Sequence, residues 1–274
     1  MKFNEIIFKM KIKDDYDKEL FFDLLFLTSK KVKTRLDFIT YRNDDIDFKF
    51  ETFFNKYNKY RISKMPIEYI FNKVNFCNEI FYIEQGVFIP RKETECIIWN
   101  FINKYKERKI NNILDLCSGS GIISCVLKMW FKESKVIGIE QSKKAIMVSN
   151  KNKLKYNLDI NFVHGDVFLE LKNYYNDVDF VFFNTTYICT ESKLHKSLSY
   201  EPTKALFAKN NGTFYYDEFF DNYFCLFKKK TLFLIEFGSN QKRYLSRLLK
   251  KNNIINFEFA RDIYGKYRFL FINF

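Results

Sequence analysis

Hydrophobic positions near the start of the chain follow a helical spacing. Phe50, Phe53, Phe54 and Tyr57 stand at i, i+3, i+4 and i+7, which places them on one face of a helix. Residues 20–27 are apolar enough for a buried helix. The pattern predicts that the N-terminal part of the chain is helical.

A shorter, β-like segment follows. Residues 74–89 contain closely spaced apolar residues, and Gly86 suits a turn between two strands. We interpret this segment as a β-hairpin that links two domains. The predicted organisation is a small helical domain over residues 1–73, the hairpin over 74–89, and a larger domain over 90–274.

From residue 111 onward, apolar strands alternate with helices. Strands are expected at 113–117, 136–140, 160–163, 178–183 and 232–237, and helices at 119–130, 142–156, 214–227 and 240–250. Residues 178–183 are almost wholly apolar, as in a strand buried on both faces. Residues 255–259 and 267–274 are expected to pair antiparallel, joined by Gly265. Repeated βα units predict an α/β fold with a mainly parallel, doubly wound sheet.

The charge balance is strongly basic. The 274 residues carry 46 Lys and Arg against 33 Asp and Glu, a formal net charge of +13. Such a charge favours an acidic partner such as nucleic acid. An excess of Lys is also what A+T-rich codons specify, and no short Lys/Arg cluster stands out. We favour the codon interpretation and expect no direct binding of nucleic acid.

Cysteine and histidine usage gives no metal signature. None of the six Cys forms a C-x-x-C pair, and there are only two His, so no metal site is predicted. We expect these cysteines to be reduced thiols in the cytosol. The chain has no run of about 18 uncharged apolar residues, and its N-terminus lacks the features of a signal peptide. We expect a monomeric cytoplasmic protein with no membrane span.

A loop with two glycines follows the first strand of the larger domain. It reads Asp115-Leu116-Cys117-Ser118-Gly119-Ser120-Gly121. Glycine permits a tight turn and lets a ligand lie against the backbone, and the helix that follows begins with free N–H groups. Ser124 stands where a third Gly would complete the dinucleotide fingerprint, so the motif alone is a weak signal. A nucleotide-like ligand is expected here, although a plain βα turn needs only one Gly.

Acidic residues follow the next two strands. Glu140 stands about 20 residues after the glycine turn, where a carboxylate accepts hydrogen bonds from ribose hydroxyls. The alternative is an exposed Glu that caps a helix. NAD and S-adenosylmethionine both carry this ribose, so the choice between them stays open. Asp166, after Gly165, either reaches an adenine amino group with Val167 against the ring, or caps the following turn.

Asn184-Thr185-Thr186-Tyr187 follows the buried strand over 178–183. A parallel sheet binds its ligands at the carboxyl ends of its strands. The Asn amide, the next backbone C=O and the Tyr ring together suit a planar –NH2 group. On spacing alone, a β-turn rich in turn-forming residues explains the segment equally well.

The order and spacing of these motifs resemble the PrmC/HemK family, the methyltransferases that modify class I peptide chain release factors. The similarity runs from about residue 66 to the C-terminus. The matching segments are Pro66–Ile70, Phe88–Glu95, Asp115–Gly121, Glu140, Gly165-Asp166, Asn184–Tyr187, Glu201–Leu206, Leu234–Gly238 and Arg261–Arg268. All three prolines of the chain lie within them, which indicates a need for fixed φ.

The resemblance implies a class I methyltransferase fold, with a seven-stranded, mostly parallel sheet and a small N-terminal helical domain that docks the substrate. It implies S-adenosylmethionine as cofactor and, as substrate, the Gln of the Gly-Gly-Gln motif of a release factor. The residues expected to bind the cofactor are Asp115, Cys117, Ser118, Gly119, Ser120, Gly121, Glu140, Asp166, Val167 and Asn184. Asn184, Thr185 and Tyr187 are expected to be catalytic, and Thr186 joins them in contacting the substrate.

The chain departs from the family pattern at three places. Thr185 and Thr186 replace the two Pro of Asn-Pro-Pro-Tyr, Lys92 replaces a usual Pro, and Cys117 replaces a usual Gly. Thr185 keeps the C=O that accepts a substrate hydrogen, but Thr does not fix φ as Pro does. We therefore predict a less preorganised site and slower turnover.

Three other functions stay open on the sequence. An amino-methyltransferase acting on a nucleic-acid base would use the same Asn-x-x-Tyr arrangement on a flipped adenine or guanine. A non-catalytic remnant, decayed at Thr185 and Thr186, would bind the cofactor without turnover. A nicotinamide dehydrogenase is disfavoured, because nothing in the sequence resembles a hydride-transfer site.

Overall fold

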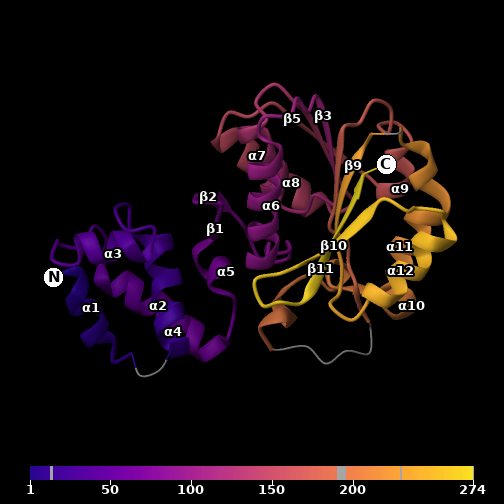
Figure 1. The fold of residues 1–274 in the computed structure, drawn as a ribbon. Helices are drawn as coiled ribbons and strands as arrows, with labels where there is room; N and C mark the ends of the chain where they lie inside the picture. The colour runs from indigo at the N-terminus through magenta and orange to yellow at the C-terminus, as the bar shows by residue number, and fades with distance from the viewer. Residues whose placement is uncertain (13–14, 190–195, 229, 274) are drawn as a thin grey trace. The chain divides into compact units, whose positions relative to one another are not determined.

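The computed structural model describes residues 1–12, 15–189, 196–228 and 230–273. The chain forms two compact units, coloured by residue number in Figure 1. One unit comprises residues 1–85 with 195–200, and the other comprises residues 86–194 with 201–274. The observed boundary, between residues 85 and 86, falls inside the segment 74–89 predicted as a linker, and both hairpin strands group with the N-terminal helices.

The first unit is a set of short helices with one hairpin. Its elements are α1 (Phe3–Met10), α2 (Asp15–Thr28), α3 (Arg35–Tyr41), α4 (Phe50–Ser63), α5 (Ile67–Phe71), β1 (Lys73–Phe76), β2 (Glu79–Tyr82) and the 3₁₀ helix η1 (Lys196–Tyr200). Phe53 and Tyr57 of α4 are buried at 1% exposure, as their spacing predicts. Phe54, which the spacing places on the same helical face, is 36% exposed.

The turn of the hairpin lies earlier than predicted. β1 and β2 pair antiparallel, and Cys77 and Asn78 connect them with φ of 52° and 61°. Two successive left-handed residues form the turn type whose twist matches a two-residue hairpin. Gly86, with φ of 88°, lies after β2 and not between the two strands.

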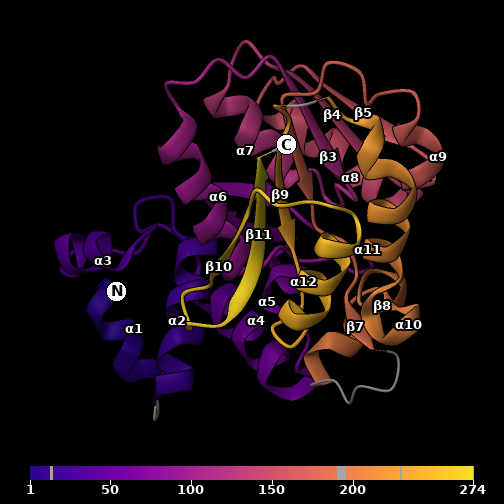
Figure 2. The same ribbon diagram turned by 45° about the vertical axis from the view of Figure 1, so that its right-hand side comes forward.

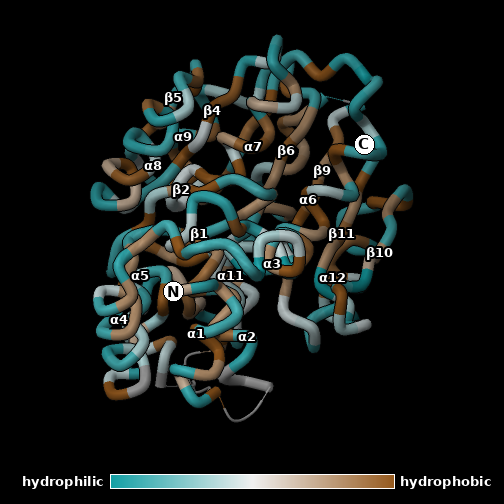
Figure 3. Tube along the Cα trace, turned by 90° about the vertical axis from the view of Figure 1, so that its left-hand side faces the viewer, coloured by the Kyte–Doolittle hydropathy of each residue, from teal (hydrophilic) through white to brown (hydrophobic). Residues whose placement is uncertain are grey.

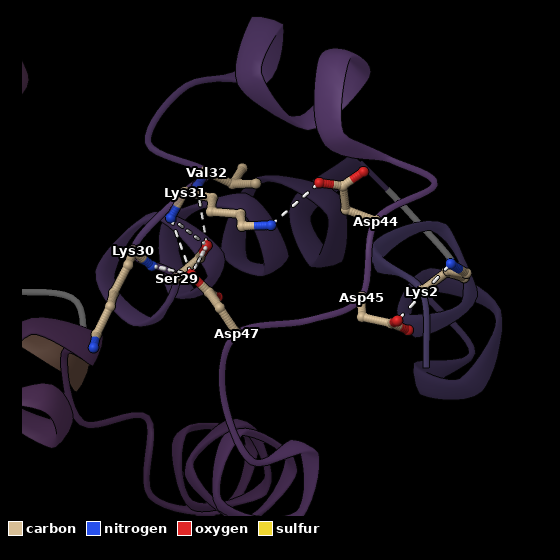
Figure 4. A network of polar contacts seen from close by, with 8 residues as sticks. All are labelled: Lys2, Ser29, Lys30, Lys31, Val32, Asp44, Asp45 and Asp47. Atoms are coloured by element: carbon tan, nitrogen blue, oxygen red, sulfur yellow. Dashed lines mark hydrogen bonds and ion pairs between the residues drawn. The ribbon is translucent and has the colours of Figure 1, made fainter.

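A polar network fixes the connection between α2 and α3 (Figure 4). The Asp47 carboxylate accepts hydrogen bonds from the backbone N–H groups of Lys30 and Lys31 at 2.6 and 3.0 Å. The hydroxyl of Ser29 accepts one from the N–H of Val32 at 2.9 Å. These bonds satisfy N–H groups of the loop that follows α2, so the loop needs no regular secondary structure.

The second unit contains a seven-stranded sheet in the order β10-β11-β9-β6-β3-β4-β5. The strands are β3 (Asn112–Leu116), β4 (Lys135–Glu140), β5 (Ile160–His164), β6 (Phe180–Phe183), β9 (Leu232–Glu236), β10 (Phe257–Arg261) and β11 (Tyr267–Asn273). The five strands from β9 to β5 in this order run parallel, and β11 pairs antiparallel with β9 and β10. The predicted fold class and the terminal antiparallel pair are confirmed.

Helices cover both faces of this sheet (Figure 1). One face carries α6 (Lys92–Tyr105), α7 (Ile122–Trp130) and α8 (Lys143–Lys155), and the other carries α9 (Val167–Leu171), α11 (Phe214–Glu218) and α12 (Lys242–Lys251). The rings of Phe101 on α6 and Phe180 on β6 stack with centroids 3.9 Å apart. The central strands β6 and β9 are buried along their whole length and appear brown in Figure 3. Continuous apolar runs are the expected sequence of such strands.

Two parts of this unit differ from the prediction. The helix expected over 214–227 is three pieces, α11, the π-helix η3 (Phe219–Tyr223) and the 3₁₀ helix η4 (Phe224–Leu226). The wide π turn brings several aromatic residues of this segment onto the core at once, with Phe219 5.1 Å from Phe183 between ring centroids. A small parallel sheet of β7 (Ile188–Cys189) and β8 (Phe207–Ala208), with η2 (Thr203–Ala205) and α10 (Lys209–Gly212) beside it, was not predicted (Figure 2).

Candidate active site

The glycine loop begins inside β3 and ends at the start of α7. Asp115 is buried at 1% exposure and accepts a short hydrogen bond from the hydroxyl of Ser124 on α7. Burial raises the pKa of Asp115 to about 7, against the lowering effect of Ser124. The N–H of Ser118 donates to the C=O of Ile139 on β4 at 3.0 Å, which ties the loop to the neighbouring strand.

The backbone of the loop is left-handed at three positions. Cys117, Gly119 and Gly121 have φ of 62°, 54° and 70°. A Cβ on Gly121 would lie 2.5 Å from the Cβ of Ser149, so this glycine is needed for packing. A Cβ on Gly119 would meet nothing within 4 Å. Gly119 therefore presents bare backbone to open space, which suits a ligand that lies against it.

Glu140, at the end of β4, faces this loop. It is 9% exposed, so it is not the exposed helix cap considered as the alternative. One carboxylate oxygen accepts the N–H of Gly119 at 2.9 Å, and the other accepts the N–H of Ser142 at 2.7 Å. Burial raises its pKa, while these N–H groups lower it. Each carboxylate oxygen has a further lone pair, so the group retains acceptors for two ribose hydroxyls.

Asp166, after β5, caps α9. Its Oδ1 accepts the N–H groups of Phe168 and Leu169 at 2.9 and 3.2 Å. The N–H of Gly165 donates to the C=O of Glu140 at 3.1 Å, and Val167 is 6% exposed. The capping interpretation therefore describes the geometry, while Oδ2 has no hydrogen-bond partner among the described residues and keeps adenine contact open as a prediction.

The segment Asn184–Tyr187 leaves the carboxyl end of β6. The Asn184 side chain is half-buried and makes no hydrogen bond within the described part of the chain. The hydroxyls of Thr185 and Thr186 are buried without a hydrogen-bond partner there, and that of Thr185 lies beside the Cys117 thiol. The Asn184 amide, half-buried and without a protein partner at the carboxyl end of a parallel strand, is therefore a group available to a ligand.

The hydroxyl of Tyr187 is held by a buried carboxylate. It donates to Glu236 Oε1 at 3.1 Å, and the hydroxyl of Thr94 donates to Glu236 Oε2 at 2.6 Å. Glu236 is 2% exposed, and burial raises its pKa as well as that of Tyr187. The predicted contact of the Tyr187 ring with substrate stays a prediction, because the structure shows this side chain as a brace. Glu236 lies in the matching segment Leu234–Gly238 but was given no role from sequence.

A second buried carboxylate fixes the segment before α6. Glu201 accepts a hydrogen bond from Arg91 at 2.6 Å and one from the N–H of Ile89 at 3.3 Å. Its side chain is 1% exposed and that of Arg91 30%. The two matching segments Phe88–Glu95 and Glu201–Leu206 are therefore joined in space. Sequence spacing gives no sign of this pair, because 110 residues separate its members.

The predicted site residues converge because of the strand order. β5, β4, β3 and β6 are consecutive parallel neighbours, so the loops after them share one edge of the sheet. Gly119, Glu140 and Asp166 therefore lie in this order along the edge, and their contacts with the backbone-facing part, the ribose and the adenine of S-adenosylmethionine stay a prediction. Among the described residues, no group of three or more His, Cys, Asp or Glu side chains could hold a metal ion. No helix in the described ranges has the length and apolar character needed to cross a bilayer.

This fold and this site define a class I methyltransferase that uses S-adenosylmethionine. A family model described as a methyltransferase domain matches residues 113–200. The catalytic domain of hMettl16 has the same fold, with a TM-score of 0.57 and 13% identity over 91% of this chain and 90% of that one. The 16S rRNA methyltransferase RsmC of Thermus thermophilus gives a TM-score of 0.52 at 14% identity, over 73% of this chain and 49% of that one.

Curated relatives identify the family. The release factor glutamine methyltransferase of Mycoplasma mycoides is 31% identical over 213 residues, which is 76% of each chain. The chain therefore belongs to the release factor glutamine methyltransferase family. The proteins of the same name from Fusobacterium nucleatum and Thermodesulfovibrio yellowstonii are 30% and 29% identical over 75% of this chain. These matches span 59% of the Fusobacterium protein and 75% of the Thermodesulfovibrio protein.

Proposed function

We propose that this chain transfers a methyl group from S-adenosylmethionine to the side-chain amide nitrogen of the Gln in the Gly-Gly-Gln motif of class I release factors. It thereby supports translation termination. The observation that carries the proposal is Asn184, whose half-buried amide has no hydrogen-bond partner among the described residues at the carboxyl end of β6. Family membership supplies the identity of the substrate.

The site must compensate for the low nucleophilicity of an amide nitrogen. Its lone pair is delocalised into the C=O, so it is a poor nucleophile. Oδ1 of Asn184 and the C=O of Thr185 accept its two N–H hydrogens, which aims the nitrogen and favours positive charge developing on it. S-adenosylmethionine, when bound, supplies a methyl group that is already electrophilic.

Positioning therefore accounts for most of the acceleration. Holding two reactants in the attack geometry is worth several kcal/mol of barrier, on the order of 7 to 11 in well-oriented systems. No strong base is needed before transfer, because the proton leaves the nitrogen afterwards. The buried Glu236 has its two oxygens engaged by Tyr187 and Thr94, which assigns it to holding the site.

The test is transfer of labelled methyl to a purified release factor, beside a copy whose motif Gln is changed to Ala. Asn184→Ala should lower kcat by about 10² to 10³, as loss of one oriented partner of the transition state does. Asn173→Ala, which removes an exposed Asn amide on the same unit, is the matched control and should leave kcat unchanged. Label on an RNA pool instead of the protein would favour the nucleic-acid alternative, and cofactor binding without any label would favour the remnant.

We also propose that the protein acts as a monomer in the cytoplasm and that its N-terminal unit docks a second surface of the release factor. All six cysteines are free, which supports a reducing compartment. Sedimentation of the full chain alone and with a release factor measures both points. A single species of about 33.3 kDa that gains one release factor is expected.

A further inference from the structure

The Asn184–Tyr187 segment must be held in shape without proline. Its two central residues are Thr, whose φ is free, whereas the family pattern has two Pro there. The acceptors proposed for the substrate amide, the side chain of Asn184 and the C=O of Thr185, lie in this segment. Some other contact must therefore fix the backbone if the site is to be preorganised.

Gln241, directly before α12, makes such a contact. It is 6% exposed, and its Nε2 donates to the C=O of Tyr187 and to the C=O of Gly212, both at 3.1 Å. Its Oε1 accepts the N–H of Gly238 at 2.9 Å. One carboxamide thus uses both donors and its acceptor on three backbone groups, at Tyr187, at the end of α10 and at Gly238.

The space around this carboxamide is closely filled. Gly212 has φ of 87°, and a Cβ on it would lie 2.2 Å from the C=O oxygen of Tyr187. The backbone at Gly212 therefore lies directly against that carbonyl. Two carbonyl oxygens that face the same buried spot repel each other unless a donor lies between them. The Nε2 group of Gln241 provides a donor to each of them.

Tyr187 is consequently fixed at both of its ends. Gln241 binds its C=O, and Glu236 accepts its hydroxyl at 3.1 Å. The next residue, Ile188, donates its N–H to the C=O of Leu206 at 3.2 Å. Thr185 and Thr186 thus lie between the rigid end of β6 and an anchored tyrosine, which leaves the short segment little freedom.

We propose that Gln241 is a positioning residue for methyl transfer, whose carboxamide supplies through hydrogen bonds the constraint that two prolines supply covalently. The inference rests on the proposed function, since that function gives the Asn184–Tyr187 segment its role. Gln241 does not touch the reacting atoms; it acts through the backbone of Tyr187. Its loss should therefore lower kcat and leave substrate and cofactor binding nearly unchanged.

Kinetics of variants test this directly. Gln241→Ala removes the carboxamide, and Gln241→Met keeps the stem and most of the volume in case the Ala variant does not fold. Both should lower kcat at least tenfold, with KM for the release factor and Kd for S-adenosylmethionine within about threefold of the parent, since a displacement of about 1 Å costs up to about a hundredfold in rate. Thr231→Ala is the matched control, because it also loses a buried hydrogen bond, of 2.8 Å, from the Thr231 hydroxyl to the C=O of Val178. These two residues precede β9 and β6, so they lie at the ends of these strands away from the Asn184–Tyr187 segment. Thr231→Ala should lower the melting temperature and leave kcat within about twofold.

Restoring the prolines separates positioning from general structure. Neither Thr185 nor Thr186 has a positive φ, and neither N–H donates a backbone hydrogen bond within the described residues, so neither of these two obstacles to Pro is present. In a chain carrying Thr185→Pro and Thr186→Pro, Gln241→Met should cost less than threefold in kcat. A loss as large as in the parent background, or a loss of kcat as large in Thr231→Ala, would overturn the proposal.

Hydrogen exchange tests the constraint by Gln241 even if the chain does not methylate a release factor. Hydrogen exchange of peptides spanning Ile188 should be at least tenfold faster in Gln241→Met than in the parent, and unchanged in Thr231→Ala. If the parent does not methylate a release factor but exchange changes as stated, the proposed function fails while the constraint by Gln241 holds. Unchanged exchange in Gln241→Met contradicts the constraint itself.

Discussion

Replacing Asp115 by Asn should remove a pH dependence of stability that arises from its burial at the start of the loop Asp115–Gly121. Burial raises the pKa of Asp115 from 3.8 to about 7, with Glu140 adding to the rise and the Ser124 hydrogen bond opposing it. The folded chain therefore keeps this proton between about pH 4 and pH 7, where the unfolded chain has released it. Because the folded state binds more protons in this window, this group's contribution to stability falls as the pH rises through it and is constant above it.

The magnitude follows from the two pKa values. A difference of about 3 units at about 1.36 kcal/mol each gives about 4 kcal/mol as the full effect. Asparagine does not titrate, so the stability of Asp115→Asn does not fall with rising pH for this reason. Its free energy of unfolding relative to the parent should therefore grow by up to about 4 kcal/mol between pH 4 and pH 8.

The assay is urea denaturation of both chains at several pH values between 4 and 8, without cofactor. Comparing the two chains at each pH cancels the titrating groups that do not interact with Asp115, such as Glu236. Ser124→Ala removes the hydrogen bond that lowers the pKa, so it should move the dependence to higher pH. A difference between Asp115→Asn and the parent that is flat over this range would refute the reasoning.

Two further predictions concern the loop and the ion pair. Gly119→Ala and Gly265→Ala both place a Cβ in open space at positive φ, of 54° and 76°, so each should cost about 1 to 2 kcal/mol of stability. Calorimetry should show that only Gly119→Ala weakens the binding of S-adenosylmethionine, by at least tenfold. Equal binding by both variants would show that Gly119 does not contact the cofactor. Glu201→Gln leaves Arg91 beside a neutral carboxamide and should cost about 2 kcal/mol, whereas Asp177→Asn, in an exposed pair with Lys228, should cost under about 0.5 kcal/mol. Denaturant unfolding of both measures this, and equal costs would show that burial of the Glu201 carboxylate does not matter.

The strands and the parallel sheet could be predicted because their sequence signal is local. A strand buried on both faces is a continuous apolar run, and residues 180–183 and 232–236 satisfy this without reference to the rest of the chain. The segment over 214–227 could not be predicted in the same way. Its helix type depends on how several aromatic residues meet the sheet, which no window of the sequence contains.

In the candidate site, too, residues with a local sequence signal could be predicted and residues placed by tertiary packing could not. Gly119, Glu140 and Asn184 were predicted as site residues because each lies at or just after the carboxyl end of a strand, and parallel strands bring their carboxyl ends together. The braces around them were not identified. Glu236 holding Tyr187, Gln241 joining Tyr187 to Gly212, and Glu201 pairing with Arg91 all link residues at least 29 positions apart. Such pairs are set by tertiary packing, for which a single sequence carries no spacing rule.

The most direct test of the central claim is to locate the methyl group. A release factor treated with this chain and S-adenosylmethionine is digested, and the peptide containing the Gly-Gly-Gln motif is fragmented in a mass spectrometer. The proposed function predicts one added methyl on the side-chain nitrogen of the motif Gln, absent when Asn184→Ala replaces the parent. An unmodified motif peptide after treatment with an enzyme that binds the cofactor would contradict the claim.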